Sequence, residues 1–376
     1  MNFKTLQDMK KNLLFFVAIA SMLALVSCSQ DTTEMADKGN VIKFRTSVSG
    51  ITRSMPLYSI TTFKVTAFID GLTTGNYFTN LTASKDNTNE WKLSHEEYWP
   101  GSGTLRFFAY YPTTIEGSET INQYEQIIKG LTVPAKDDQQ SDVIVACNSG
   151  TRVANESSGI DLKFQHILSQ IDVKVRNIKT ENYQIDVKNM KLVGFKTRAD
   201  FVFPTSSTAS AISLSNWKNA SMEGYHYSYR GNSNSIYTLT NNYYSLVDTY
   251  FMVIPQQLTA WNNTASKSGA YIALLMRIYN KDGSNKQQIF PKMQGRFAYV
   301  AVPIDTKLEP GKKYTFNLTF MENGAGNIAP DQTNPENIDV VDPNPGTGGD
   351  LVIGGPIKVS VTVSDWGDNN YIDKNP

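Results

Sequence analysis

Histidine and cysteine are scarce in this chain, and neither sign of charge is in excess. The 376 residues include three histidines and two cysteines, and 35 basic side chains balance 35 acidic ones. The histidines, His95, His166 and His226, lie far apart, and no His or Cys pair has the spacing of metal ligands. We therefore expect no metal site and no disulfide scaffold. The lack of basic excess argues against a nucleic-acid partner.

Sequence motifs for catalysis are missing as well. The chain contains no Gly-x-Ser-x-Gly elbow, no phosphate-binding loop and no dinucleotide fingerprint. The adjacent acids Glu96-Glu97 and Asp137-Asp138 would point to opposite faces of a strand, which is poor geometry for paired catalytic carboxylates. His166 lies between Phe164 and Ile167 and is expected in the core or at a strand edge. We expect no catalytic residue, no cofactor and no enzymatic activity.

Apolar residues recur with a period of two, and no amphipathic helix of three turns is evident. Nineteen Tyr and eighteen Phe, together with abundant Thr, Ser and Asn, favour strands. Strands are expected within 42–48, 63–69, 105–111, 171–175, 185–187, 250–254, 271–278, 314–320 and 357–363. Many short strands between Gly, Asn and Pro turns predict an all-β protein with two antiparallel β-sandwich domains in series.

The first thirty residues have the order of a secretory signal. Three lysines form a positive head, residues 12–25 are almost entirely apolar, and the Leu-Val-Ser that ends at Ser27 precedes Cys28. This lipobox predicts removal of residues 1–27 and acylation of Cys28, which would hold the protein on outer-membrane lipid. An ordinary cleaved signal is the alternative. Cleavage would change the formal net charge to −2 and leave Cys147, expected to be a small buried hydrophobe, as the remaining thiol.

Polar stretches divide the rest of the chain. Residues 28–40 are expected to form a tether, 41–157 an N-terminal sandwich and 158–376 a C-terminal sandwich. The boundary is placed at the polar stretch 155–160. Residues 322–355 are rich in Asn, Asp, Pro and Gly and are expected to be a mobile loop. This loop would be either a tether that lets the last strand move or a long hairpin loop.

Tyrosines cluster in the region 225–244. Tyr225, Tyr227 and Tyr229 are candidate glycan contacts, because they could form an aromatic platform for sugars together with Tyr243 and Tyr244. Packing between the strands of a tyrosine-rich sandwich is the alternative for the same residues.

Several segments together carry a resemblance to a known family. These are the lipobox cysteine, Thr52-Arg53-Ser54, Trp91, Tyr98-Trp99-Pro100, Leu105-Arg-Phe-Phe-Ala-Tyr-Tyr-Pro112, Asp161-Leu-Lys-Phe-Gln-His-Ile-Leu-Ser-Gln-Ile-Asp-Val-Lys-Val175, Val253-Ile-Pro-Gln256 and Val361-Thr-Val-Ser-Asp-Trp366. In this order they resemble the fimbrillin-like family, the lipoprotein subunits of type V pili in Gram-negative anaerobes. The resemblance implies two transthyretin-like β-sandwich domains, export to the cell surface or fimbrium, and assembly with other pilus subunits after proteolysis.

A removable first strand would follow from such assembly. We expect a trypsin-like, Arg-specific protease to cut between Arg53 and Ser54, because Gly50 to Pro56 lacks strand alternation and should form an accessible loop. Arg45, within the strand, is the second choice. Loss of the strand that carries Ile42, Phe44 and Val48 would open a hydrophobic groove, which the strand of another subunit could fill.

The last strand has the alternation that such a donor needs, at Ile357, Val359, Val361 and Val363. It is either a donated strand or simply the last strand of its own domain. The short tail after residue 366 favours a tip or accessory subunit, which accepts a strand without offering one. The alternative function is a surface lipoprotein that binds glycans for a nutrient-uptake system; an enzyme is a third class.

Overall fold

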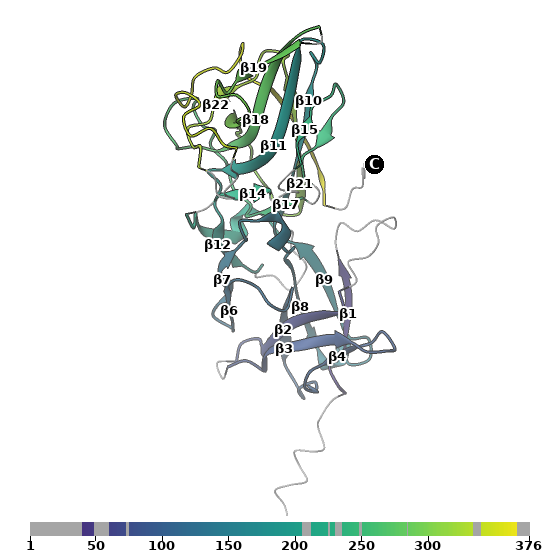
Figure 1. Ribbon diagram of the computed structural model, residues 1–376. Coiled ribbons are helices and arrows are strands. Elements are labelled where there is room, and N and C mark those ends of the chain that lie inside the picture. Colours follow the sequence, from purple (N-terminus) through teal and green to yellow (C-terminus); the bar gives the residue numbers. More distant parts are fainter. Residues whose placement is uncertain are drawn as a thin grey trace, which may run out of the picture.

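The chain folds into an elongated molecule built almost entirely of strands (Figure 1). The computed structural model describes residues 40–48, 60–72, 75–204, 212–224, 226–229, 235–247, 250–283, 285–333 and 340–366. Helical structure within these residues is limited to α2 (Arg152–Asn155) and two 3-10 turns, η2 (Asp137–Gln139) and η3 (Leu214–Asn216). The expected all-β class is confirmed.

One end of the molecule is a seven-stranded sheet with the order β1-β9-β8-β5-β2-β3-β4. The strands are β1 (Phe44–Val48), β9 (Ile160–His166), β8 (Ile144–Thr151), β5 (Thr104–Tyr111), β2 (Thr62–Ile69), β3 (Phe78–Lys85) and β4 (Trp91–Leu93). β1 is parallel to β9, whereas the other ladders of this sheet are antiparallel. The first strand of the described chain therefore lies at a sheet edge.

The other end consists of two sheets, of five and seven strands, that pack face to face. One sheet has the order β16-β10-β21-β23, with β17 also paired to β10; the other has the order β14-β11-β18-β20-β22, with β15 and β19 added to its sides. The first sheet contains β16 (Tyr244–Ser245), β10 (Ser169–Asn177), β21 (Lys312–Phe320), β23 (Lys358–Asp365) and β17 (Phe251–Val253). The second contains β14 (Tyr227–Tyr229), β11 (Tyr183–Val193), β18 (Tyr271–Asp282), β20 (Ala298–Pro303), β22 (Asn327–Ile328), β15 (Tyr237–Thr238) and β19 (Asn285–Phe290).

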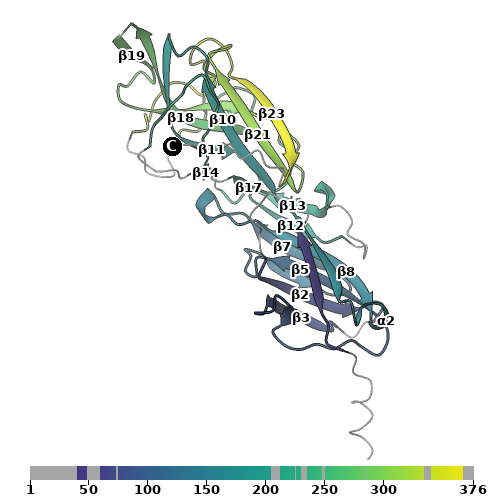
Figure 2. The ribbon, with the colours of Figure 1, turned by 90° about the vertical axis from the view of Figure 1, so that its right-hand side faces the viewer.

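A small four-stranded sheet lies between the two ends (Figure 2). Its order is β13-β12-β7-β6, formed by β13 (Trp217–Ser221), β12 (Arg198–Val202), β7 (Gln126–Thr132) and β6 (Ser118–Ile121). This sheet combines strands from both halves of the sequence.

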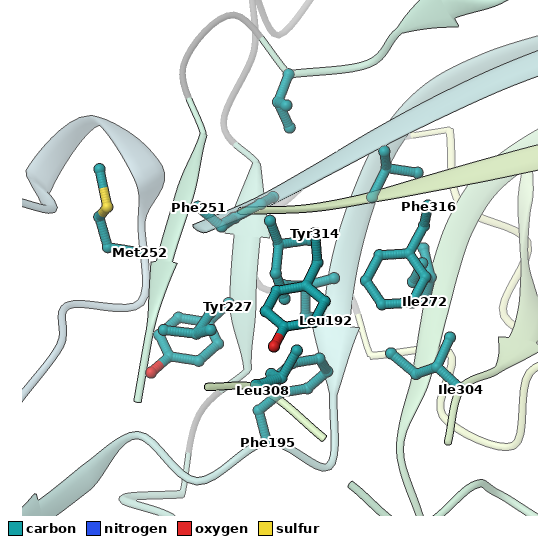
Figure 3. Packing of buried hydrophobic residues seen from close by; sticks show 14 of the residues in the cluster. Leu192, Phe195, Tyr227, Phe251, Met252, Ile272, Ile304, Leu308, Tyr314 and Phe316 are labelled. Carbon is teal, nitrogen blue, oxygen red and sulfur yellow. The ribbon is translucent and has the colours of Figure 1, made fainter. Parts of the chain in front are cut away.

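Alternating side chains explain how these sheets bury their cores. In the C-terminal half, Leu192 and Ile272 of one sheet face Tyr314 and Phe316 of the other, and Phe251 lies beside them (Figure 3). All five residues are buried, as the period of two predicts for the inner faces of stacked sheets.

β5 has no polar face because both of its faces are covered. Leu105, Phe107 and Ala109 belong to the core of the first sheet, whereas Phe108 and Tyr110 point to the opposite side. There the ring of Phe108 lies 5.4 Å from that of Phe203, next to the small middle sheet. A strand buried on both faces reads as a continuous apolar run, which is the pattern of 105–111.

The boundary expected after residue 157 does not follow the sheets. β9 lies beyond this boundary in the sequence, yet it pairs with β1 and β8 in the first sheet. The polar stretch that suggested a linker is a turn, in which the N–H of Gly159 donates to the carbonyl of Asn155 at 2.8 Å. This correction has a simple cause: polar turns within a sheet and linkers between domains share the same composition.

The expectation of a mobile loop at 322–355 is wrong for the residues described there, 322–333 and 340–355. Residues 325–329 are buried, and β22 pairs with β20. A Cβ on Gly324 would meet backbone atoms of Gly355 at 2.2 Å, so glycine allows two backbones to pack directly on each other. β21 and β23, which this segment connects, are antiparallel neighbours, as in a hairpin with a long connection.

The core of the first sheet supplies a stability prediction. Phe107→Ala removes a ring that is fully buried against Phe44 and Trp99, and should lower the free energy of unfolding by about 3–5 kcal/mol. Urea unfolding followed by tryptophan fluorescence measures this change. Tyr124→Ala is the control, because that side chain is 79% exposed and its loss should change the free energy by less than about 0.5 kcal/mol. Equal effects of both changes would contradict the assigned core.

Candidate functional site

The edge strand β1 has a single ladder partner among the described strands. Its register with β9 runs from Phe44 opposite Ile160 to Val48 opposite Phe164. Before the strand, Val41 forms an isolated bridge with Tyr98. Since only one ladder holds β1 in the sheet, its departure would expose the edge of β9 without breaking any other strand pair.

The inner side chains of β1 fill an aromatic slot. Ile42 and Phe44 are 2% and 6% exposed, respectively, and Val48 is partly buried on the same core. The Phe44 ring lies 5.7 Å from the rings of Phe63 and Phe107, with its plane nearly perpendicular to both. Edge-to-face packing of this kind adds stability beyond the area buried. The expected inward positions of this strand are therefore buried.

A polar contact completes the slot. The indole Nε1 of Trp91 donates to the hydroxyl of Thr46 at 3.2 Å. Trp91 also packs on Phe63, with ring centroids 4.6 Å apart. We use the name β1 slot for the apolar surface covered by β1, which is lined by Phe63, Trp91, Phe107, Ile160 and Phe164.

The chain just before β1 is held by hydrogen bonds to neighbouring loops. The N–H of Asn40 donates to Oε1 of Glu156 at 2.7 Å, and the N–H of Ile42 donates to the carbonyl of Glu97 at 2.8 Å. The hydrogen bond from Asn40, helped by Arg152, outweighs desolvation and holds the pKa of the Glu156 carboxyl below its ordinary value. These contacts fix where β1 enters the sheet.

The last described strand, β23, is also an edge strand, but its side chains are less buried than those of β1. Val359, Val361 and Val363 lie opposite Leu318, Phe316 and Tyr314 of β21. These three partners are buried, but Val361 and Val363 are 40% and 52% exposed. β23 lies at the outer edge of its sheet (Figure 2), where the opposite layer does not cover these valines.

In addition to its ladder with β21, β23 has buried residues at both of its ends. Ile357 is buried where the strand begins. At the other end, Trp366 stacks on the ring of His166 at 4.4 Å, with an interplanar angle of 9°. The Oδ2 atom of the Asp142 carboxylate accepts a 2.7 Å hydrogen bond from Nδ1 of His166. Because His166 is the last residue of β9, the strand that pairs with β1 also contacts the end of β23.

The remaining residues singled out in the sequence fall into two groups. Cys28, Arg53, Ser54 and Tyr225 lie outside the described residues. Arg45 is exposed on the outer side of β1.

Two candidate glycan contacts are corrected by their burial. Tyr227 and Tyr229 are 0% and 3% exposed, so neither ring can stack on a sugar. They form β14, which is packed in the core beside Phe195. The packing alternative explains them, because an alternating tyrosine pattern does not reveal whether its strand lies at the surface.

Cys147 and the described acids give no sign of reactive chemistry. Burial raises the pKa of the Cys147 thiol to about 11, which suits a packing role rather than a nucleophile. No cluster of His, Cys, Asp or Glu that could hold a metal occurs within the described ranges. In the same part of the chain no helix is long and apolar enough to cross a membrane.

Sequence reasoning missed two contacts of this region. The Trp91–Thr46 hydrogen bond joins residues 45 positions apart, and the stacking of His166 on Trp366 joins the end of β9 to the end of the described chain. Both depend on tertiary placement, which the local sequence pattern does not reveal.

The contact of Trp366 predicts how firmly β23 is held. Trp366→Ala removes a buried ring at the strand end, and amide hydrogen exchange in 358–365 should become at least about tenfold faster. Val363→Thr is the control, since this half-exposed side chain keeps its shape and should leave exchange unchanged. Unchanged exchange in the Trp366→Ala protein would show that the ladder with β21 alone holds the strand.

A sequence family and a solved structure are similar to this chain over most of its length. The sequence model of the fimbrillin-like family matches residues 58–341. A fimbrial protein from Bacteroides vulgatus has a TM-score of 0.56 at 16% identity, with 87% of this chain and 99% of that chain covered. Putative cell adhesion proteins from Parabacteroides distasonis and Bacteroides ovatus have TM-scores of 0.46 and 0.45, at 10% and 13% identity. The comparison with the former covers 88% of this chain and 98% of the other, and with the latter 87% and 98%.

No curated protein matches this chain. The structural likeness to the Bacteroides vulgatus protein supports a shared fold, and the family match extends over most of the sequence. The chain belongs to the fimbrillin-like family.

Proposed function

We propose that this chain is a structural pilus subunit, exported as an outer-membrane lipoprotein through Cys28 and assembled by strand exchange after proteolysis. The observation that carries the proposal is β1: an edge strand with one ladder partner whose inner side chains plug an aromatic slot. The proposed architecture is two transthyretin-like sandwiches in series, preceded by a signal peptide at 1–27 and a tether at 28–40.

Energetics favour refilling of the slot. Burial of one large apolar side chain is worth about 1.5–3 kcal/mol, so loss of Ile42, Phe44 and Val48 would leave several kcal/mol of uncompensated apolar surface. The edge of β9 would also lose its hydrogen-bond partners. An incoming strand can satisfy both, with ladder hydrogen bonds for affinity and alternate side chains for register.

The proposed cleavage point lies between β1 and β2. β1 ends at Val48 and β2 begins at Thr62, so a cut after Arg53 separates the two strands without touching either. Arg45 is exposed but lies within the β1 ladder, between the buried Phe44 and the partly buried Thr46. A protease needs an extended, unpaired substrate, which makes Arg45 the poorer site.

The proposed place in the pilus is at the tip or as an accessory subunit. Such a subunit accepts a strand at the β1 slot. β23, which could be offered to a neighbour, is paired with β21 and anchored at Trp366. The glycan-binding alternative has lost its support at Tyr227 and Tyr229, because both are buried.

Replacement of one arginine tests the processing step. Arg53→Ala should abolish the new N-terminus at Ser54, because a trypsin-like protease requires a basic residue before the cut bond. N-terminal sequencing after brief trypsin treatment, and of the protein recovered from cells, checks this outcome. Arg45→Ala serves as the matched control and should still be cut after Arg53. An Arg53→Ala protein that matures and assembles normally would refute the assignment.

A second substitution tests the anchor. Cys28→Ser should abolish incorporation of a labelled fatty acid, because the thiol that would carry the acyl chain is absent. The measurement is gel detection of the label. Cys147→Ser should retain the label. A labelled Cys28→Ser protein would disprove lipidation at this residue.

A further inference from the structure

Two inward positions of β1 have specific chemical requirements. The position of Phe44 lies between the rings of Phe63 and Phe107, both 5.7 Å away, and is suited to another ring. The position of Thr46 faces the indole N–H of Trp91, which needs an acceptor at 3.2 Å. Trp91 is itself buried, so water cannot easily replace that acceptor.

The last described strand, β23, and the residue before it repeat part of the sequence in and around β1. Aligned without gaps, Ile42-Lys43 matches Ile357-Lys358, and Val48-Ser49 matches Val363-Ser364. This alignment sets a register in which the strand of a second copy could enter the β1 slot.

In that register β1 and β23 differ at the positions of Phe44 and Thr46. Val359 takes the place of Phe44, and Val361 takes the place of Thr46. A valine at the first position would leave a void between Phe63 and Phe107 and lose both edge-to-face contacts. A valine at the second would leave the Trp91 N–H buried without an acceptor.

We propose that the β1 slot selects its incoming strand at these two positions, and that the strand comes from a different subunit. The partner strand carries an aliphatic residue, an aromatic residue, a Ser or Thr and a β-branched residue at alternate positions. It runs parallel to β9. This inference rests on the proposed strand exchange and adds the identity of the partner: β23 of a second copy enters poorly because its valines match neither requirement.

Strand peptides added to the nicked protein test this selectivity. The chain without residues 1–27, with a specific protease site in place of residues 50–56, is folded intact and then cut. Fluorescent peptides then compete for the slot: residues 41–49, residues 356–364, and 356–364 with Val359→Phe, with Val361→Thr or with both changes. Peptide uptake and displacement of the nicked β1 are measured by anisotropy and mass spectrometry.

The peptide 41–49 and the doubly substituted peptide should enter at similar concentrations. The unchanged peptide 356–364 should need a concentration roughly 100-fold higher, because it combines a void with an unsatisfied N–H. A Trp91→Phe acceptor removes the N–H donor. It should accept the peptide 356–364 equally well with and without Val361→Thr, while it keeps its preference for the peptide with Val359→Phe.

Two different failures are distinguishable. If the unchanged peptide 356–364 enters as readily as 41–49, the slot is not selective and a second copy of this chain is an adequate partner. The proposed strand exchange would still stand in that case. If even the peptide 41–49 fails to enter the nicked protein, the slot does not exchange strands. The proposed function then falls together with this inference.

Discussion

The packing of Phe44 against Phe63 and Phe107 is the contact on which the first sheet depends at its β1 edge. A sheet that buries aromatic side chains up to its edge needs an edge strand to keep water from them. β1 fulfils this role with one ladder, and its partner β9 presents Ile160, Leu162 and Phe164 to the same core. The requirement is for an extended strand, because only a strand satisfies the β9 backbone and the apolar surface together.

β9 contacts both the first described strand, β1, and the residue that follows the last one, β23. It lies between β1 and β8, and its last residue, His166, stacks on Trp366 just beyond β23. His166 is also hydrogen-bonded to Asp142, so its ring is fixed from both sides. The first and the last described strands are therefore attached to one element, although they belong to different sheets.

Local pattern predicted many of the strands, because the period of two depends only on which face of a strand is buried, but it gave no sign of others such as β3, β8 and β20. It identified the inward side chains of β1 and the position of β5, whose burial on both faces was learned from the structure. It failed where distant partners decide the outcome. The segment expected to be mobile is held by Lys191, whose ammonium contacts the Asp331 carboxylate and donates to the Thr333 carbonyl. Burial opposes ionisation of Asp331, yet hydrogen bonds from His226 and Thr333 and the Lys191 charge keep its pKa well below the ordinary value.

Two edge strands with similar alternation, β1 and β23, are thus held in different ways. β1 is held along its length by its inward side chains, whose removal would leave an apolar slot and a Trp91 N–H without its acceptor. β23 is held by its ladder and by buried residues at its ends, while Val361 and Val363 remain half in water. Removal of β23 would bare the β21 edge beside Tyr314, Phe316 and Leu318, but two of the three valines opposite these residues are already half in water, whereas removal of β1 would uncover the aromatic slot that Ile42 and Phe44 fill. Sequence alternation alone could not reveal this asymmetry, because it depends on how far the opposite layer extends over each edge.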